Sequence, residues 1–304
     1  MTWVAWRLQR TETLITVAIL ALLAALLVPT GINMANAYHD AGLGACTAVK
    51  TASASACGAN VGEFETRFQG LLQLTDWFTL IPGLIGVLLA APFIFDLEHG
   101  TYRLAWTQSI TRRRWLAGKL ALPVAAGAVA AGILILLVTW WRTPDVHLNG
   151  RMGNGAYDGE GTVAIGYTLF ALGLALALGA VWRKAAASLT VAFVGYFVMR
   201  ILVDTWLRDK LVPPLKTTFR GDQPASLNHA DIISQNVVGH AGVKFGGGGQ
   251  VAAPSGRGGS PLFEAVYQPA SHFWPLQLAE TGLFVGLAVL LIGFAAWWTH
   301  ERTV

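Results

Sequence analysis

The chain has 304 residues, a formal net charge of +4 and an isoelectric point near 9.2. Apolar residues make up 54% of it and charged residues only 12%, about half the share of ~25% that is usual in soluble domains. This composition excludes an ordinary soluble domain. The net positive charge is explained by Lys and Arg residues that flank membrane segments, so it gives no reason to expect a nucleic-acid partner.

Six apolar runs are long enough to cross a bilayer, which needs roughly 20 apolar residues per helix. The predicted transmembrane helices cover residues 13–32, 77–95, 120–141, 162–182, 185–206 and 275–298. Most of the 12 tryptophans lie at or near the ends of these runs, at the depth where Trp prefers the lipid headgroups. We therefore predict an all-α polytopic membrane protein that contacts membrane lipid.

Orientation follows from the Lys and Arg residues of the short connecting segments. These residues are dense in segments 1–12, 96–119, 183–184 and 299–304. They are spread thinly over the segments of the opposite side, 33–76, 142–161 and 207–274. Both termini are therefore predicted to be cytosolic, and the three longer segments extracytoplasmic.

Residues 1–12 combine two tryptophans with two arginines, which predicts a short interfacial helix, although a plain charged segment explains them equally well. Together with the apolar run and the A-N-A sequence at 35–37, they also resemble a secretory signal peptide. The run is longer than the roughly 7–15 apolar residues of such signals, so we expect it to stay as the first transmembrane helix.

Both cysteines of the chain, Cys46 and Cys57, lie in the segment 33–76. On an oxidising side of the membrane we expect them to form a disulfide. A metal site is less favoured, because no nearby His or Cys completes four ligands.

The segment 207–274 is long and contains a glycine-rich stretch at 244–260, which is typical of a flexible tether. The residues around Asp231–Val238 are predicted to form a short helix or a re-entrant element.

Motifs of enzymes are missing from the sequence. There is no G-x-x-x-x-G-K-[ST] phosphate-binding loop and no H-E-x-x-H zinc motif, and the seven histidines are scattered. We predict that the chain is not an enzyme, binds no metal and holds no cofactor.

Ionisable residues are scarce within the six runs, and Arg200 and Asp204 are the exception. They are four residues apart and so lie on one helix face, where we expect them to pair near the membrane surface. A role in lining an outward gate is the alternative. No charged relay crosses the bilayer, so a secondary transporter is poorly supported.

The segment 96–119 reads D-L-E-H-G-T-Y-R-L-A-W-T-Q-S-I-T-R-R-R-W-L-A-G-K. Thr111 is a candidate N-cap of the third transmembrane helix. The arginines at 112–114 are explained as positive-inside anchors or as contacts to lipid or a partner.

The pattern of Asp96, Glu98, Gly100 and Thr101 resembles the acidic-x-acidic-x-Gly-Thr segment of ABC-2-type transporter permeases. Lys119 matches the lysine that opens their third helix. The whole segment, and the closing region Y-Q-P-A-S-H-F-W-P-L-Q, are similar to a subset common among actinobacteria. Asp96 stands where many relatives carry glutamate.

This resemblance implies the membrane subunit of an ATP-driven exporter in a bacterial cell membrane. It would pair with itself or with a paralogous permease, and with two copies of a separate ATPase that binds ATP and Mg²⁺. The coupling residues would be Asp96, Glu98, Gly100, Thr101, Arg103 and Lys119.

In this family the second and fifth helices line the substrate route. The candidate lining residues are Phe78, Phe193, Tyr196, Phe197 and Arg200, with lipid-facing aromatics as the alternative for the four rings. We also expect Pro82-Gly83 to loosen the second helix and Ala171, Ala175 and Gly179 to allow close helix packing.

Two other functions stay open at this point. A non-transporting sensor or immunity component could pair with an ATPase in the same way, and a stand-alone transporter would need no partner. An apolar route favours amphipathic drugs, lipids or peptides as the substrate.

Overall fold

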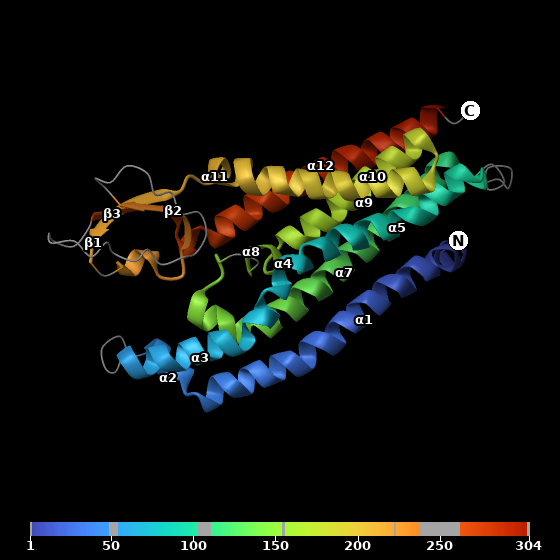
Figure 1. The fold of residues 1–304 in the computed structure, drawn as a ribbon. Coiled ribbons are helices and arrows are strands. Elements are labelled where there is room, and N and C mark those ends of the chain that lie inside the picture. The colour runs from blue at the N-terminus through green and yellow to red at the C-terminus, as the bar shows by residue number, and fades with distance from the viewer. Residues whose placement is uncertain are drawn as a thin grey trace.

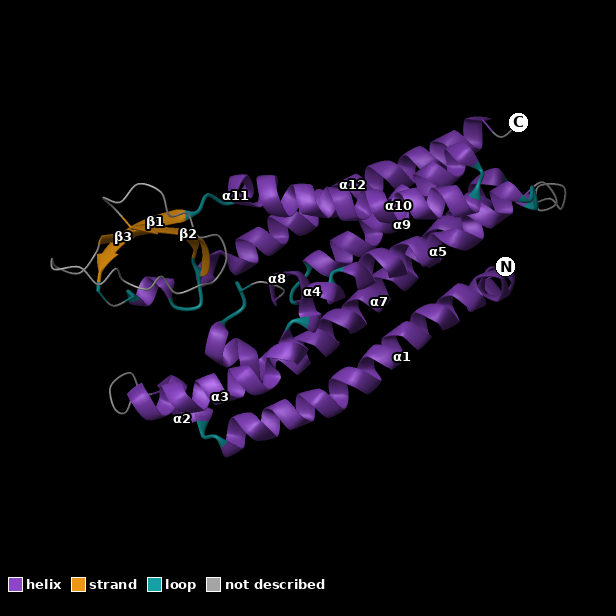
Figure 2. Ribbon diagram, viewed as in Figure 1, coloured by secondary structure: helices purple, strands orange, loops and turns teal. Residues whose placement is uncertain are grey.

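The computed structural model describes residues 2–48, 54–102, 111–153, 156–221, 223–237 and 262–302. Its long helices lie side by side in an elongated bundle, with both chain ends at one end of it (Figure 1). We call this end the terminal end, and the opposite end the distal end. A small sheet and the helices α2 (Leu43–Ala48) and α3 (Ala54–Leu72) lie at the distal end (Figure 2).

The long helices are α1 (Thr2–Asp40), α3 (Ala54–Leu72), α5 (Leu80–Glu98), α7 (Arg112–Asn149), α9 (Val163–Trp182), α10 (Ala185–Leu202) and α12 (Phe273–Arg302). The shorter ones are α2 (Leu43–Ala48), α4 (Leu74–Phe78), α8 (Ala156–Gly159) and α11 (Arg208–Leu211). A π-helix at Val203–Leu207 joins α10 to α11.

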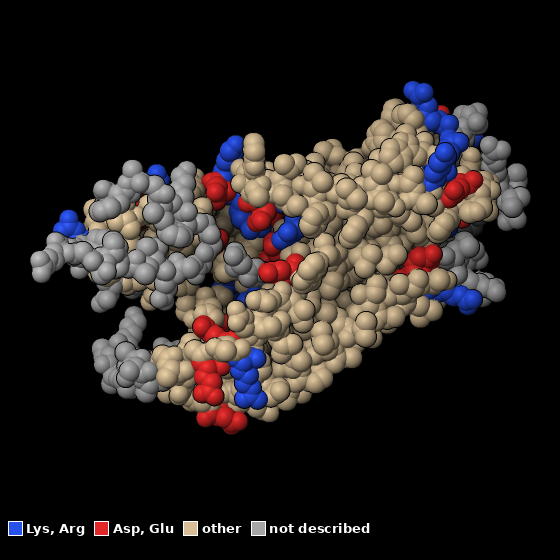
Figure 3. Space-filling model, viewed as in Figure 1, with Lys and Arg blue, Asp and Glu red and all other residues tan. Residues whose placement is uncertain are grey.

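Within the described residues, six helical segments are long and apolar enough to cross a membrane: Arg10–Asp40, Cys57–Glu98, Arg112–Asn149, Val163–Trp182, Ala185–Leu211 and Ala270–Arg302. On the face shown in Figure 3, charged side chains gather toward the two ends and leave a broad uncharged band between them. This is the surface expected of a bundle that crosses a bilayer.

Several helices are longer than the apolar runs predict. α1 begins at Thr2, so residues 2–12 are the first turns of this helix and not a separate interfacial helix. No glycine or proline interrupts the chain there to end a helix. Its 39 residues span about 58 Å at roughly 1.5 Å per residue, so its ends extend beyond a hydrocarbon core of about 30 Å.

α9 is the central helix of the bundle and packs on α5, α7, α10 and α12. Its small residues let neighbouring backbones come close, as predicted from Ala171, Ala175 and Gly179. A Cβ added at Gly86 of α5 would lie 2.3 Å from the backbone oxygen of Thr168, which no side chain could tolerate.

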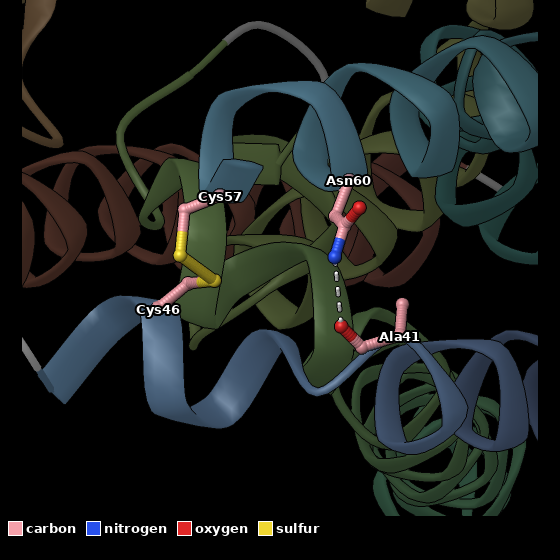
Figure 4. The surroundings of a disulfide bond; sticks show 4 residues. All are labelled: Ala41, Cys46, Cys57 and Asn60. Atoms are coloured by element: carbon pink, nitrogen blue, oxygen red, sulfur yellow. Dashed lines mark hydrogen bonds between the residues drawn. A yellow bond between two sulfur atoms is a disulfide. The ribbon is translucent and has the colours of Figure 1, made fainter. Parts of the chain in front are cut away.

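The predicted loop 33–76 is largely helical. α2 and α3 are joined by a disulfide between Cys46 and Cys57, with Cα atoms 5.6 Å apart (Figure 4). The side-chain amide of Asn60 donates a hydrogen bond to the backbone oxygen of Ala41 at 3.3 Å. These contacts hold α3 against the end of α1.

The second predicted helix is interrupted, but not at Pro82-Gly83. α4 ends at Phe78 and α5 begins at Leu80, so the interruption lies at Thr79. Pro82 falls in the first turn of α5, where the missing N–H costs little.

The segment 207–274 contains the strands β1 (Leu215–Arg220), β2 (Asp231–Val237) and β3 (Leu262–Gln268). They form an antiparallel sheet in the order β1-β3-β2. The prediction of a short helix or re-entrant element at Asp231–Val238 is therefore wrong. The sequence D-I-I-S-Q-N-V is rich in β-branched residues and pairs along β3. The glycine-rich stretch 244–260 lies outside the described residues.

Candidate functional site

The last turn of α5 and the turn that follows it, at the terminal end, hold most of the predicted coupling residues. Gly100 has a φ of +69°, a conformation that glycine adopts without strain, and it turns the chain away from α5. Asp96 forms an ion pair with Lys119 of α7. The hydroxyl of Thr101 donates a hydrogen bond of 2.9 Å to Oδ1 of Asp96, so three predicted residues meet.

Glu98 connects the same turn to a third helix. Its Oε2 accepts a hydrogen bond of 3.0 Å from the backbone N–H of Ala185, the first residue of α10. Lys184, at the N-cap position, makes no side-chain capping bond, so Glu98 satisfies a backbone donor that would otherwise lack a partner within its helix. A carboxylate at this position also interacts favourably with the helix dipole.

We name the set of Asp96, Glu98, Thr101 and Lys119 the terminal network. It ties together the ends of α5, α7 and α10. Lys119 lies inside α7, which begins at Arg112 after Thr111 as predicted, although Thr111 makes no side-chain capping bond. Arg103 and the rest of residues 103–110 lie outside the described residues.

A second group of charged residues lies at the distal end, and all of them except Asp204 are largely buried. Arg200 of α10 pairs with Asp158 of α8. Arg208 of α11 contacts Asp158 at 3.1 Å and Glu280 of α12 at 3.3 Å. Arg208 also pairs with Asp204 in the π-helix. We name these five residues the distal cluster.

Two tyrosines complete the hydrogen bonds of the distal carboxylates. The hydroxyl of Tyr167 donates to Glu280 at 2.6 Å and to Asp158 at 3.1 Å. The hydroxyl of Tyr157 donates to Glu280 at 3.0 Å, and the guanidinium of Arg208 lies 4.2 Å from the centre of its ring. Burial, reinforced by Glu280, raises the pKa of Tyr157 far above its usual range, so its hydroxyl stays a donor.

The π-helix explains how one helix contributes both arginines. It covers Val203–Leu207, between Arg200 and Arg208, and changes the rotation of the chain at that point. Both guanidinium groups reach Asp158 as a result. Short π-helices of this kind are frequent at functional sites.

A separate buried group lies beside the distal cluster, on α7 and the chain that precedes α9. Arg142 pairs with Asp145, and its Nε lies 3.6 Å from Glu160. Nε of the half-exposed Arg151 is 3.7 Å from the other carboxylate oxygen of Glu160. Neither oxygen has a hydrogen-bond partner among the described residues. Burial raises the pKa of Glu160 to about 7, against the opposing effect of Arg142.

A cavity of about 280 Å³ opens onto the distal cluster. Its lining residues are Asp76, Thr79, Met152, Gly153, Tyr157, Asp158, Arg200, Asp204, Arg208 and Asp231. Water in this cavity can reach the ion pairs. Among the described residues, no group of three or more His, Cys, Asp and Glu side chains is arranged to hold a metal ion.

The predicted pairing of Arg200 with Asp204 is wrong, because the two residues pair with Asp158 and Arg208 instead. The expectation that no further ionisable residues lie within the runs is also wrong. Glu280 lies inside the sixth run and is fully buried. The position of Glu280 within an apolar run could have been recognised in the sequence. Nothing in the sequence indicated that Asp158 would lie beside it.

The candidate route residues differ in their surroundings. Tyr196 is fully buried, its hydroxyl donates to the backbone oxygen of Thr79 at 2.7 Å, and its ring packs on Gly83. Phe193 packs near it, with ring centres 6.5 Å apart. Phe78 is buried beside Trp141, whereas Phe197 is exposed on α10.

Comparison with known proteins identifies the family to which the chain belongs. No curated protein and no solved structure shows significant similarity to the chain. The family described as ABC-2 membrane transporter related matches residues 17–208, more than half of the chain. The match includes the terminal network and all of the distal cluster except Glu280. The chain therefore belongs to this family, and it is a multi-pass membrane protein of the kind that forms the permease component of an ABC transporter.

Proposed function

We propose that this chain is the permease subunit of an ATP-driven exporter. It works as a dimer, with itself or a paralogous permease, and docks two separate ATPase subunits at the terminal end. Residues 96–119 receive the movement of the ATPases. The membership in the family supports the transporter component. The dimer and the export direction follow from the resemblance of the sequence, and the docking of an ATPase at the terminal end rests on the terminal network.

The terminal network is the observation that carries the proposal. The last turn of α5 is bonded to α7 through Asp96 and Lys119, and to α10 through Glu98 and Ala185. A force applied to this turn therefore reaches three spanning helices at once. Such a turn suits a site where a partner outside the membrane changes the arrangement of the helices.

The need for a partner follows from the sequence. It has no phosphate-binding loop of the G-x-x-x-x-G-K-[ST] type, so the chain cannot supply ATP binding of that kind itself. The short segments of the terminal end are rich in Lys and Arg, which supports a cytosolic position for that end, on the side where ATP is available.

The proposal is tested by purifying the chain in mild detergent from its native cells and identifying its partners by mass spectrometry. We expect a P-loop ATPase in about a one-to-one ratio with the chain. A folded chain that purifies without an ATPase would overturn the proposal and favour a stand-alone membrane protein. Transport by the complex in proteoliposomes then separates an exporter from a sensor or immunity component.

A further inference from the structure

α10 is held to the rest of the protein at its two ends and along one narrow face, where the hydroxyl of Tyr196 bonds the backbone oxygen of Thr79. At the terminal end Glu98 bonds the backbone N–H of Ala185, and at the distal end Arg200 pairs with Asp158. Between these points only a narrow face is buried, formed by Ser188, Ala192 and Tyr196. Much of the remaining helix surface is exposed, for example Val194 at 55%.

We propose that the distal cluster is a latch that holds α10 and α11 against α8 and α12, and that its opening widens the distal end of the substrate route. The inference rests on the proposed function, together with the expectation from the family that the fifth spanning helix, here α10, lines the substrate route. Moving α10 and α11 outward would separate Arg200 from Asp158 and Arg208 from Glu280 in one step. The movement would be passed along α10 from the terminal network.

The partners of each charge favour contacts that can open and close over contacts that are permanent. Arg208 pairs with Asp204, which lies four residues before it on the same helical segment. This pair would move together with α10, so Arg208 keeps a counter-ion when the latch opens. Asp204 is also four residues from Arg200 and can receive it on the same face.

The carboxylates on α8 and α12 also keep hydrogen-bond donors when the latch opens. Glu280 keeps the hydroxyls of Tyr157 and Tyr167, and Asp158 keeps that of Tyr167, because these tyrosines lie on α8 and α9. The cavity of about 280 Å³ admits water to the separated groups. A buried charge without a partner costs several kcal/mol in general. The hydroxyl donors and the water lower this cost for the carboxylates, and Asp204 lowers it for Arg208.

The test measures how often α10 separates from its neighbours. Ala192 is fully buried on the inner face of α10, eight residues before Arg200. Both native cysteines are in the disulfide, so Ala192→Cys supplies a single thiol. The full chain in lipid nanodiscs is treated with a polar maleimide, and the labelling rate is followed by mass spectrometry.

The latch predicts opposite effects for two variants in this background. Arg200→Gln removes the ion pair between α10 and Asp158, so labelling should become faster by about tenfold or more. Asp204→Asn removes the counter-ion that Arg200 would gain in the open position, and labelling should become slower by about threefold. Arg200→Lys keeps the charge and should label at the parent rate.

Asp209→Asn is the matched control, because Asp209 is an exposed carboxylate on α11 that makes no ion pair among the described residues. Should Arg200→Gln fail to give a monodisperse protein, Arg208→Gln tests the same latch from α11. Labelling of Arg200→Gln, or of Arg208→Gln in its place, at the rate of Asp209→Asn would overturn the latch. The labelling needs no ATPase, so the failure of the latch and the failure of the proposed function are distinguished.

Discussion

The carboxylate of Glu98 at the end of α5 accepts a hydrogen bond of 3.0 Å from the backbone N–H of Ala185 at the start of α10. The two residues are far apart in the sequence, and they join two of the helices that we place along the substrate route. The bond makes the position of α10 depend on the turn that is proposed to bind the ATPase. Glu98, which belongs to a predicted docking motif, thus also has a hydrogen-bond partner within the chain.

Replacing Glu98 should weaken coupling more than stability. Glu98→Ala removes the acceptor of the Ala185 N–H, and the loss of a helix cap costs about 1 kcal/mol. We expect a small decrease in melting temperature and a large decrease in the stimulation of ATPase activity by substrate. Glu98→Gln keeps an acceptor oxygen, so its ATPase stimulation should lie between that of the native protein and that of Glu98→Ala.

The matched control for this prediction is Glu65→Ala, an exposed glutamate on α3 at the distal end. Both proteins are compared in the reconstituted complex with the ATPase. Equal ATPase stimulation in Glu98→Ala and Glu65→Ala would remove Glu98 from the coupling site.

Asp96 and Lys119 should show strong energetic coupling. Their side chains are only 18% and 10% exposed, so removing one partner leaves the other largely buried and without its counter-ion. We expect Lys119→Met to cost on the order of 3 kcal/mol, and the double variant Asp96→Asn/Lys119→Met to cost less than the sum of the single changes. A double-mutant cycle from thermal unfolding measures the difference. Additive single effects would show that the ion pair has no role in stability.

Breaking the disulfide should loosen the distal helices and leave the spanning helices intact. Cys46 and Cys57 are 11 residues apart, and a loop of this size stabilises by about 2.5–3 kcal/mol in the chain-entropy model. We expect Cys46→Ser/Cys57→Ser to increase amide hydrogen exchange in α2 and α3, but not in α9. Free alkylatable thiols in the untreated native protein would contradict the pairing itself.

Glu160 should make stability depend on pH near neutrality. Its pKa is about 7 in the folded protein and about 4.5 in the unfolded chain, so between these values the folded state binds more protons. The free energy of unfolding should therefore fall as pH rises from about 4.5 to 7, by up to about 3 kcal/mol, and then level off.

Glu160→Gln removes this titration. It should raise the melting temperature at pH 8 and leave it nearly unchanged at pH 5. Thermal unfolding of both proteins across this pH range is the measurement, with Glu65→Gln as the exposed control. A melting temperature that falls at pH 8 in Glu160→Gln would show that the charged form of Glu160 is favoured by its two arginines.

The sequence determined the number and approximate positions of the spanning helices, because long apolar runs and the charges between them depend only on local composition. It also determined the family, through the residues from Asp96 to Lys119. Cys46 and Cys57 could be predicted to pair since they are the chain's two cysteines and lie close together in the sequence.

The tertiary structure alone decided which charges meet. Asp158 lies in a short helix between two runs and Glu280 near the end of the chain, and only the packing of α8, α10 and α12 brings them to Arg200 and Arg208. The π-helix that turns both arginines toward Asp158 leaves no periodic signal in the sequence. β2 likewise depends on pairing with β3, a partner distant in the chain. The contacts between the helices depend on the close packing around the small residues of α9, and local sequence patterns do not encode which distant segments this packing brings together.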